Sequence, residues 1–200
     1  MTLVSRAVVF AANAHEGMTR KGTHIPYIVH PMEVAAIAAS LTDDSEVIAA
    51  CLLHDVIEDC GVTQEQLCEQ FGPRVAFLVA HESQVQAGDP RETWDVRKRA
   101  AVDRIASGCR DAQIIALSDK LSNMRAIARD YARDGDAMFF RFHQHDKRRH
   151  AWYYRSCAAL LRERFGDTDA WQELCEWVEY VFAGIPKEEF EQDDAEACAG

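Results

Sequence analysis

The residues best suited to chemistry lie in residues 53–59, Leu-His-Asp-Val-Ile-Glu-Asp. As a continuous helix, this segment places His54 with Glu58, and Asp55 with Asp59, four residues apart on shared sides. Three carboxylates near the negative end of a helix dipole repel one another, and a divalent cation would offset that repulsion. Histidine with carboxylates is a ligand set suited to manganese, iron or zinc. The alternative is a solvated acidic helix end with an incidental histidine.

Two further polar residues stand in apolar surroundings. Asp119 interrupts the apolar run that begins at residue 114, and a buried aspartate needs a partner. Asn123 follows four residues later on the same helical face, whereas Lys120 points about 100° away and is expected to make another contact. His30 directly precedes Pro31 at a predicted helix start, a place where a lone histidine is more often a structural hydrogen-bonding group.

A basic loop, residues 18–27 (Met-Thr-Arg-Lys-Gly-Thr-His-Ile-Pro-Tyr), comes just before His30. Gly22 and Pro26 break regular structure there, and Arg20 and Lys21 give it positive charge in an acidic chain. We interpret the loop as a candidate contact for an anionic ligand. A solvated surface loop is the alternative.

The elements that must position these residues are predicted to be helices, because no segment alternates apolar and polar residues as strands do. Ser45 is the expected N-cap of a helix through 47–58, and Gly61 is its expected end. Thr63 with Gln66 forms a capping-box pattern, and Gly72-Pro73 opens the next helix. The other helices are expected to include residues 33–37, 75–79, 92–106, 112–130, 137–165 and 169–182.

Composition limits the possible functions. The chain has 200 residues, with 22 Lys and Arg against 33 Asp and Glu, for a net charge of −11. Such a chain is a poor passive binder of nucleic acid or of an anionic membrane. No apolar run approaches the roughly 18 residues of a membrane span. The seven cysteines form no CxxC pair, so we expect reduced thiols and a cytoplasmic location.

We predict one domain over residues 1–185 and a short acidic tail over residues 186–200. From residue 187 onward the tail holds six acidic residues and one lysine, a net charge of −5. This composition is typical of a disordered end.

Several segments together resemble the HD superfamily of metal-dependent phosphohydrolases. His30, the His54-Asp55 doublet and Asp119 match its four HD positions. Segments 20–23 (Arg-Lys-Gly-Thr), 26–31, 53–59, 71–72 and 118–123 are similar to the RelA/SpoT-type hydrolase domain, and especially to its stand-alone form, the small alarmone hydrolases. The resemblance covers about residues 5 to 165 and implies an all-α, HD-domain helical bundle.

The resemblance also implies the chemistry. One metal, usually Mn²⁺ with other divalent transition metals possible, would bind His30, His54, Asp55 and Asp119. Glu58 and Asp59 would be catalytic, activating water and organising the metal site. Arg20, Lys21, Tyr27 and Asn123 would contact a guanosine nucleotide. The implied reaction removes the 3′-pyrophosphate of guanosine tetra- or pentaphosphate, giving GDP or GTP and pyrophosphate.

Departures from the family pattern leave the substrate open. Residues 80–84 (Ala-His-Glu-Ser-Gln) stand where the family usually has a Val-Thr segment. The stretch 139–153, which helps close the nucleotide pocket in the family, is unusually aromatic and basic. The other hypotheses are an HD phosphohydrolase acting on another nucleotide such as NADPH, and a non-catalytic nucleotide sensor. Intact Glu58 and Asp59 argue against the sensor.

Two polar clusters are interpreted as parts of the surface. His143, His145 and His150 do not all share one helical face and lie among basic residues, so we favour a solvated or phosphate-facing surface over a second metal site. Residues 97–99 (Arg-Lys-Arg) are most simply a solvated helix face, with phosphate contact the alternative.

Overall fold

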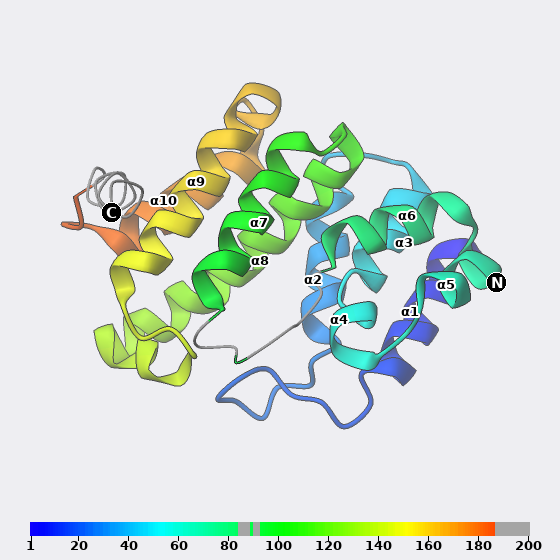
Figure 1. Ribbon diagram of the computed structural model, residues 1–200, viewed down its shortest axis with the longest axis horizontal. Coiled ribbons are helices and arrows are strands. Elements are labelled where there is room, and N and C mark those ends of the chain that lie inside the picture. Colours follow the sequence, from blue (N-terminus) through cyan, green and yellow to red (C-terminus); the bar gives the residue numbers. More distant parts are fainter. Residues whose placement is uncertain (84–88, 90–92, 187–200) are drawn as a thin grey trace, which may run out of the picture.

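The computed structural model describes residues 1–83, 89 and 93–186. Their helices follow in chain order (Figure 1): α1 Leu3–Ala14, α2 Val29–Ala38, α3 Ser45–Leu53, α4 Val56–Cys60, α5 Gln64–Phe71, α6 Pro73–Glu82, α7 Trp94–Ser107, α8 Arg110–Asp134, the 3₁₀ helix η1 Gly135–Arg141, α9 Lys147–Phe165 and α10 Asp169–Phe182. The described residues contain no strand, and one isolated bridge joins Thr19 to Pro26. The all-α prediction is confirmed. The predicted disordered tail falls almost wholly outside the described residues.

Local signals explain several helix boundaries. Thr63 and Gln66 form the predicted reciprocal capping box of α5. Pro73 is the first residue of α6, where its missing N–H leaves no helical hydrogen bond unmade. Gly61 ends α4 with φ of 68°, a left-handed conformation that glycine adopts without steric cost. The predicted N-cap Ser45 is wrong by one residue, because the Asp44 carboxylate accepts from the Glu46 N–H.

Three expectations about helices need correction. The single helix predicted over 47–58 is two, because α3 ends at Leu53 and α4 begins at Val56. The helix predicted over 137–165 is also divided, with η1 at its start and an irregular segment before α9. Helix α1 was not expected from the sequence. Its N-cap Thr2 accepts from the Ser5 N–H, and its buried alanines pack against α3.

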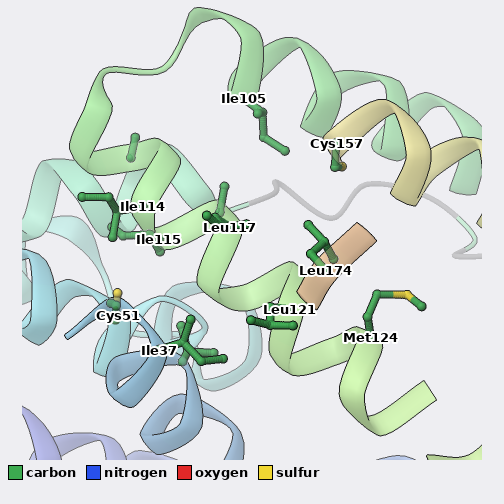
Figure 2. Close-up of a cluster of buried hydrophobic side chains, with 14 of the residues drawn as sticks. Ile37, Cys51, Ile105, Ile114, Ile115, Leu117, Leu121, Met124, Cys157 and Leu174 are labelled. Atoms are coloured by element: carbon green, nitrogen blue, oxygen red, sulfur yellow. The ribbon is translucent and has the colours of Figure 1, made fainter. Parts of the chain in front are cut away.

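Helix α8 forms the centre of the core. It packs against α2, α3, α9 and α10, and Figure 2 shows side chains from these helices meeting around it. The labelled residues include Ile37 of α2, Cys51 of α3, Cys157 of α9 and Leu174 of α10. Because α8 is buried along most of its length, the polar side chains in its middle turns are held inside the protein. This central position brings Asp119 to the ends of α2 and α3.

The six cysteines among the described residues are free thiols, as expected. No helix within the described part of the chain is long and apolar enough to cross a membrane.

Candidate metal centre

The break between α3 and α4 determines the position of the His54-Asp55 doublet. The last carbonyls of a helix lack helical N–H partners, and the Cys51 carbonyl oxygen lies 2.7 Å from His54 Nδ1. A carbonyl only accepts, so Nδ1 carries a proton and Nε2 is the nitrogen left to face the neighbouring carboxylates or a cation. That Nε2 lies 3.1 Å from Asp55 Oδ2. The predicted stacking of Asp55 with Asp59 along one helix is therefore replaced by a turn that points Asp55 back at His54.

His30 approaches the same point from the first turn of α2. Its Nδ1 lies 2.9 Å from the Ser122 hydroxyl, which lies 2.7 Å from Glu33 Oε2. Its Nε2 lies 3.2 Å from Asp119 Oδ1 and 3.6 Å from Asp55 Oδ2. The side chain is 3 % exposed, so the position is well shielded from water.

Asp119 completes the cluster from the middle of α8. Its Oδ1 lies 3.7 Å from His54 Nε2 and accepts a 2.6 Å hydrogen bond from Asn123 Nδ2, one turn along the helix. Its Oδ2 accepts from Lys120 Nζ. The expectation that Lys120 makes a different contact is wrong, because the long lysine side chain bends back to the adjacent carboxylate despite the angle between neighbouring helical positions.

The chemistry of these groups fits a cation. The single ligand atoms of His30, His54 and Asp55 lie within 4.8 Å of one another, and Asp119 Oδ1 adjoins both histidines. His54 Nε2 is buried and has no hydrogen-bond partner. Burial opposes protonation of His54, yet the Asp55 and Asp119 carboxylates outweigh it and raise the pKa of His54 well above its usual value. The four residues thus form a nitrogen and oxygen set that attracts positive charge.

A cavity of about 560 Å³ opens beside this cluster. Its walls include all four residues predicted to contact substrate, Arg20, Lys21, Tyr27 and Asn123. Arg20 donates to Asn123 Oδ1 at 3.0 Å, and the Tyr27 hydroxyl donates to Asp55 Oδ2 at 2.6 Å. The cavity therefore joins a basic wall to His30, and through Tyr27 and Asn123 it adjoins the Asp55 and Asp119 carboxylates.

Glu58 and Asp59 are not among the described residues that line this cavity. Partial withdrawal from water and the nearby Asp55 charge raise the pKa of Asp59 to about 6, while the Tyr27 hydroxyl opposes that rise. Burial lowers the pKa of Lys98 to about 8, and Glu58 is one of the acids whose charge opposes that shift. The two acids therefore sit in different surroundings, Asp59 near Tyr27 and Glu58 near Lys98.

Most of the chain is similar in sequence to a known protein family. Residues 7–144 match the HD domain family. The chain belongs to this family. The guanosine-3′,5′-bis(diphosphate) 3′-pyrophosphohydrolase of Vibrio cholerae is 39 % identical over 124 residues, 61 % of this HD-domain chain. The GTP pyrophosphokinase of Myxococcus xanthus is 34 % identical over 132 residues, 64 % of the chain. The chain spans 17 % of the length of each of these relatives.

A solved structure resembles this HD-domain protein over nearly its whole length. It is described as a metazoan ortholog of SpoT that hydrolyses ppGpp. The two share 25 % sequence identity with a TM-score of 0.70, over 88 % of this chain and 94 % of the other. The likeness extends past residue 144, into the helices that follow the matched family segment.

The sequence did not indicate every residue that lies near the metal centre or its cavity. Lys98 is half-buried beside Lys120, with its Nζ 4.5 Å from the Tyr153 ring centre, so the prediction of a solvated face at 97–99 is wrong for this residue. Phe142 and Tyr154 line the cavity, as the aromatic character of that region suggests. Arg129 also lines it, and no local pattern in the sequence marks that arginine.

The three downstream histidines do not form a second cluster in the described residues. His150 is buried among the Trp94, Phe139 and Phe142 rings, and its Nε2 donates to the Gln144 carbonyl oxygen at 2.8 Å. It is a buried structural histidine, so the expectation of a solvated or phosphate-facing surface is wrong for this residue.

Proposed function

We propose that this chain removes the 3′-pyrophosphate of guanosine tetra- or pentaphosphate, giving GDP or GTP and pyrophosphate. The observation that carries the proposal is the convergence of two histidine Nε2 atoms and two carboxylates beside a cavity with a basic wall. The activities named for the Vibrio cholerae relative and for the metazoan protein support this substrate. The proposal includes a cytoplasmic location.

His30, His54, Asp55 and Asp119 are the proposed ligands of one Mn²⁺ per chain. When bound, a divalent cation acts as a Lewis acid and lowers the pKa of water that it binds. The hydrogen bonds of the two Nδ1 atoms to Ser122 and Cys51 leave both Nε2 atoms as the nitrogens available to a metal.

Glu58 and Asp59 are proposed to orient the attacking water and to accept its proton. With a pKa of about 6, Asp59 is mostly ionised at neutral pH and is still a competent proton acceptor. Tyr27 donates to Asp55, so its hydroxyl holds that carboxylate in one orientation. The reaction consumes one water and breaks the bond between the ribose 3′ oxygen and phosphorus. The 3′ oxygen takes up a proton, and pyrophosphate leaves.

Arg20, Lys21 and Asn123 are proposed to bind the nucleotide. The charged guanidinium of Arg20 already faces the cavity, where Asn123 and the Tyr27 ring hold it in place. The Lys21 ammonium lies 6.0 Å from the Phe142 ring centre, across the cavity mouth. Positive groups placed in this way favour a small polyanion, although the whole chain is acidic.

The test is a substrate panel with purified protein and Mn²⁺. Guanosine tetraphosphate, guanosine pentaphosphate, GTP and NADPH are offered separately, and phosphate and pyrophosphate release are measured independently. We expect pyrophosphate release from the first two, lost in Asp55→Ala and Glu58→Ala. Phosphate release from NADPH alone would contradict the proposal and identify another nucleotide as substrate. Nucleotide binding without turnover in metal-loaded protein would indicate a sensor.

A further inference from the structure

A hydrogen-bonded chain lies behind His30, on the side away from the metal centre. A carboxylate has no proton to give, so the Ser122 hydroxyl donates its only proton to Glu33 Oε2. Ser122 Oγ can then only accept from His30 Nδ1, at 2.9 Å. This leaves the lone pair of His30 on Nε2, 3.2 Å from Asp119 Oδ1. The serine and the glutamate thus determine which nitrogen of His30 faces the centre.

The chain continues outward to the last helix. Arg125 Nη1 lies 3.2 Å from Glu33 Oε1, and its other nitrogens donate to both Glu173 oxygens at 2.7 and 2.6 Å. Trp177 Nε1 also donates to Glu173, at 3.0 Å. Glu173 and Trp177 belong to α10, which lies beyond the residues 7–144 that match the HD domain family. The C-terminal helix is therefore linked to His30 by successive polar contacts.

A second buried serine on α8 differs from Ser122 in the group to which its hydroxyl donates. Ser118 lies one turn earlier and is also buried, but its hydroxyl donates to the Ile114 carbonyl oxygen within the same helix. Such a bond is the usual way for a helical serine to satisfy its hydroxyl. Ser122 instead directs its proton across to α2. The two residues match in type, helix and burial and differ in partner.

We propose that Ser122 and Glu33 are positioning residues for a metal ion at His30, and that Arg125 and Glu173 hold Glu33 in place. This inference rests on the proposed function only in requiring a metal at the histidine and carboxylate cluster. Groups behind a ligating histidine fix its tautomer and ring orientation, and their loss typically weakens metal binding by about 10- to 100-fold.

The test is a Mn²⁺ titration of the metal-stripped protein, residues 1–200, monitored by calorimetry or by competition with a fluorescent chelator. Ser122→Ala is expected to weaken Mn²⁺ binding by about 10- to 100-fold, whereas the matched control Ser118→Ala leaves it within about twofold. Ser122→Thr, which keeps the hydroxyl, is expected to restore most of the affinity. Glu33→Gln is expected to weaken binding less than Ser122→Ala, and Glu173→Gln least.

A spectroscopic readout separates positioning from general damage to the fold. In metal-free wild type, ¹⁵N NMR of the His30 ring is expected to show the neutral Nδ1–H tautomer, and in Ser122→Ala a gain of the Nε2–H tautomer. Unchanged Mn²⁺ affinity in both Ser122→Ala and Glu33→Gln, or a wild-type Nε2–H tautomer, would overturn the positioning role and leave the proposed function standing. Wild type that binds no divalent cation would overturn both.

Discussion

His54 and His150 are equally buried, at 4 % and 6 % exposed, and each gives one ring nitrogen to a backbone carbonyl. Their other surroundings differ. His54 faces the Asp55 and Asp119 carboxylates, whereas His150 is surrounded by aromatic rings. The carboxylates raise the pKa of His54 against its burial, and burial lowers the pKa of His150 to about 4. Burial alone makes a neutral, structural histidine, and adding carboxylates makes a site that attracts a cation.

The largest expected effect comes from removing a charge at the His54 site. Asp119→Asn keeps the shape of the side chain but removes a carboxylate that faces both histidines. We expect hydrolysis of guanosine tetraphosphate to fall by at least about 10³-fold, because one oxygen ligand and the charge balance of the centre are lost together. Asp111→Asn on the same helix is the control, since Asp111 pairs with Arg74 away from the site. Equal losses in both variants would contradict the assignment of Asp119.

Exchanging each histidine for glutamine tests whether His54 serves metal binding and His150 serves stability. His150→Gln removes a packed ring and the hydrogen bond to Gln144, and should lower the free energy of unfolding by about 3 kcal/mol. Mn²⁺ affinity should stay within a fewfold of wild type. His54→Gln should abolish Mn²⁺ binding, because it removes a ligand nitrogen from the centre. Chemical denaturation and metal titration of both variants test this reciprocal pattern, and a reversed pattern would overturn the comparison.

The pKa of His150 predicts a pH dependence of stability. In the unfolded chain this histidine takes up a proton below its ordinary pKa of 6.5, whereas in the folded protein it stays neutral until about pH 4. The nearby Lys98 charge opposes protonation of the folded histidine, and the Asp146 charge favours it. Stability should therefore fall by about 3 kcal/mol between pH 6.5 and pH 4, with little further loss from this group below pH 4. Denaturation curves of wild type and His150→Phe should converge as pH falls through this window. A constant difference between them would contradict the prediction.

The smallest expected effect comes from one hydroxyl at the edge of the His54 site. Tyr27→Phe removes the 2.6 Å hydrogen bond to Asp55 and keeps the ring stacked on His15. Because a hydrogen bond to a charged group contributes about 1.5–3 kcal/mol at most, we expect a loss of about 10-fold in kcat/KM. Steady-state kinetics measure it, with Tyr180→Phe on α10 as the control. An unchanged kcat/KM would show that Asp55 needs no support from Tyr27.

Three of the four metal-ligand candidates break a local rule in the sequence. His54 and Asp55 follow a helix that is otherwise apolar, and Asp119 interrupts another such helix. Polar groups in such places need partners, and the resemblance to the HD superfamily joined them with His30 into one ligand set. The geometry was less predictable. The turn between α3 and α4 replaced the expected continuous helix, because His54 and Asp55 form contacts that a straight helix would not allow.

Long-range pairings could not be predicted from the sequence. Lys98 stands in a run of basic residues that looks like a solvated face, and only the packing of α7 against α9 brings it close to the Tyr153 ring. The Ser122–Glu33 bond joins residues 89 positions apart in the chain. Neither segment carries a periodicity or motif that specifies its partner, so these contacts follow from the tertiary fold alone.

The most direct test of the central claim is an X-ray structure of crystals soaked in Mn²⁺, with anomalous scattering to locate the ion. We predict one strong peak per chain, within bonding distance of His30 Nε2, His54 Nε2, Asp55 and Asp119. No peak at this cluster, or a peak coordinated by other residues in its place, would contradict the assignment of the metal centre.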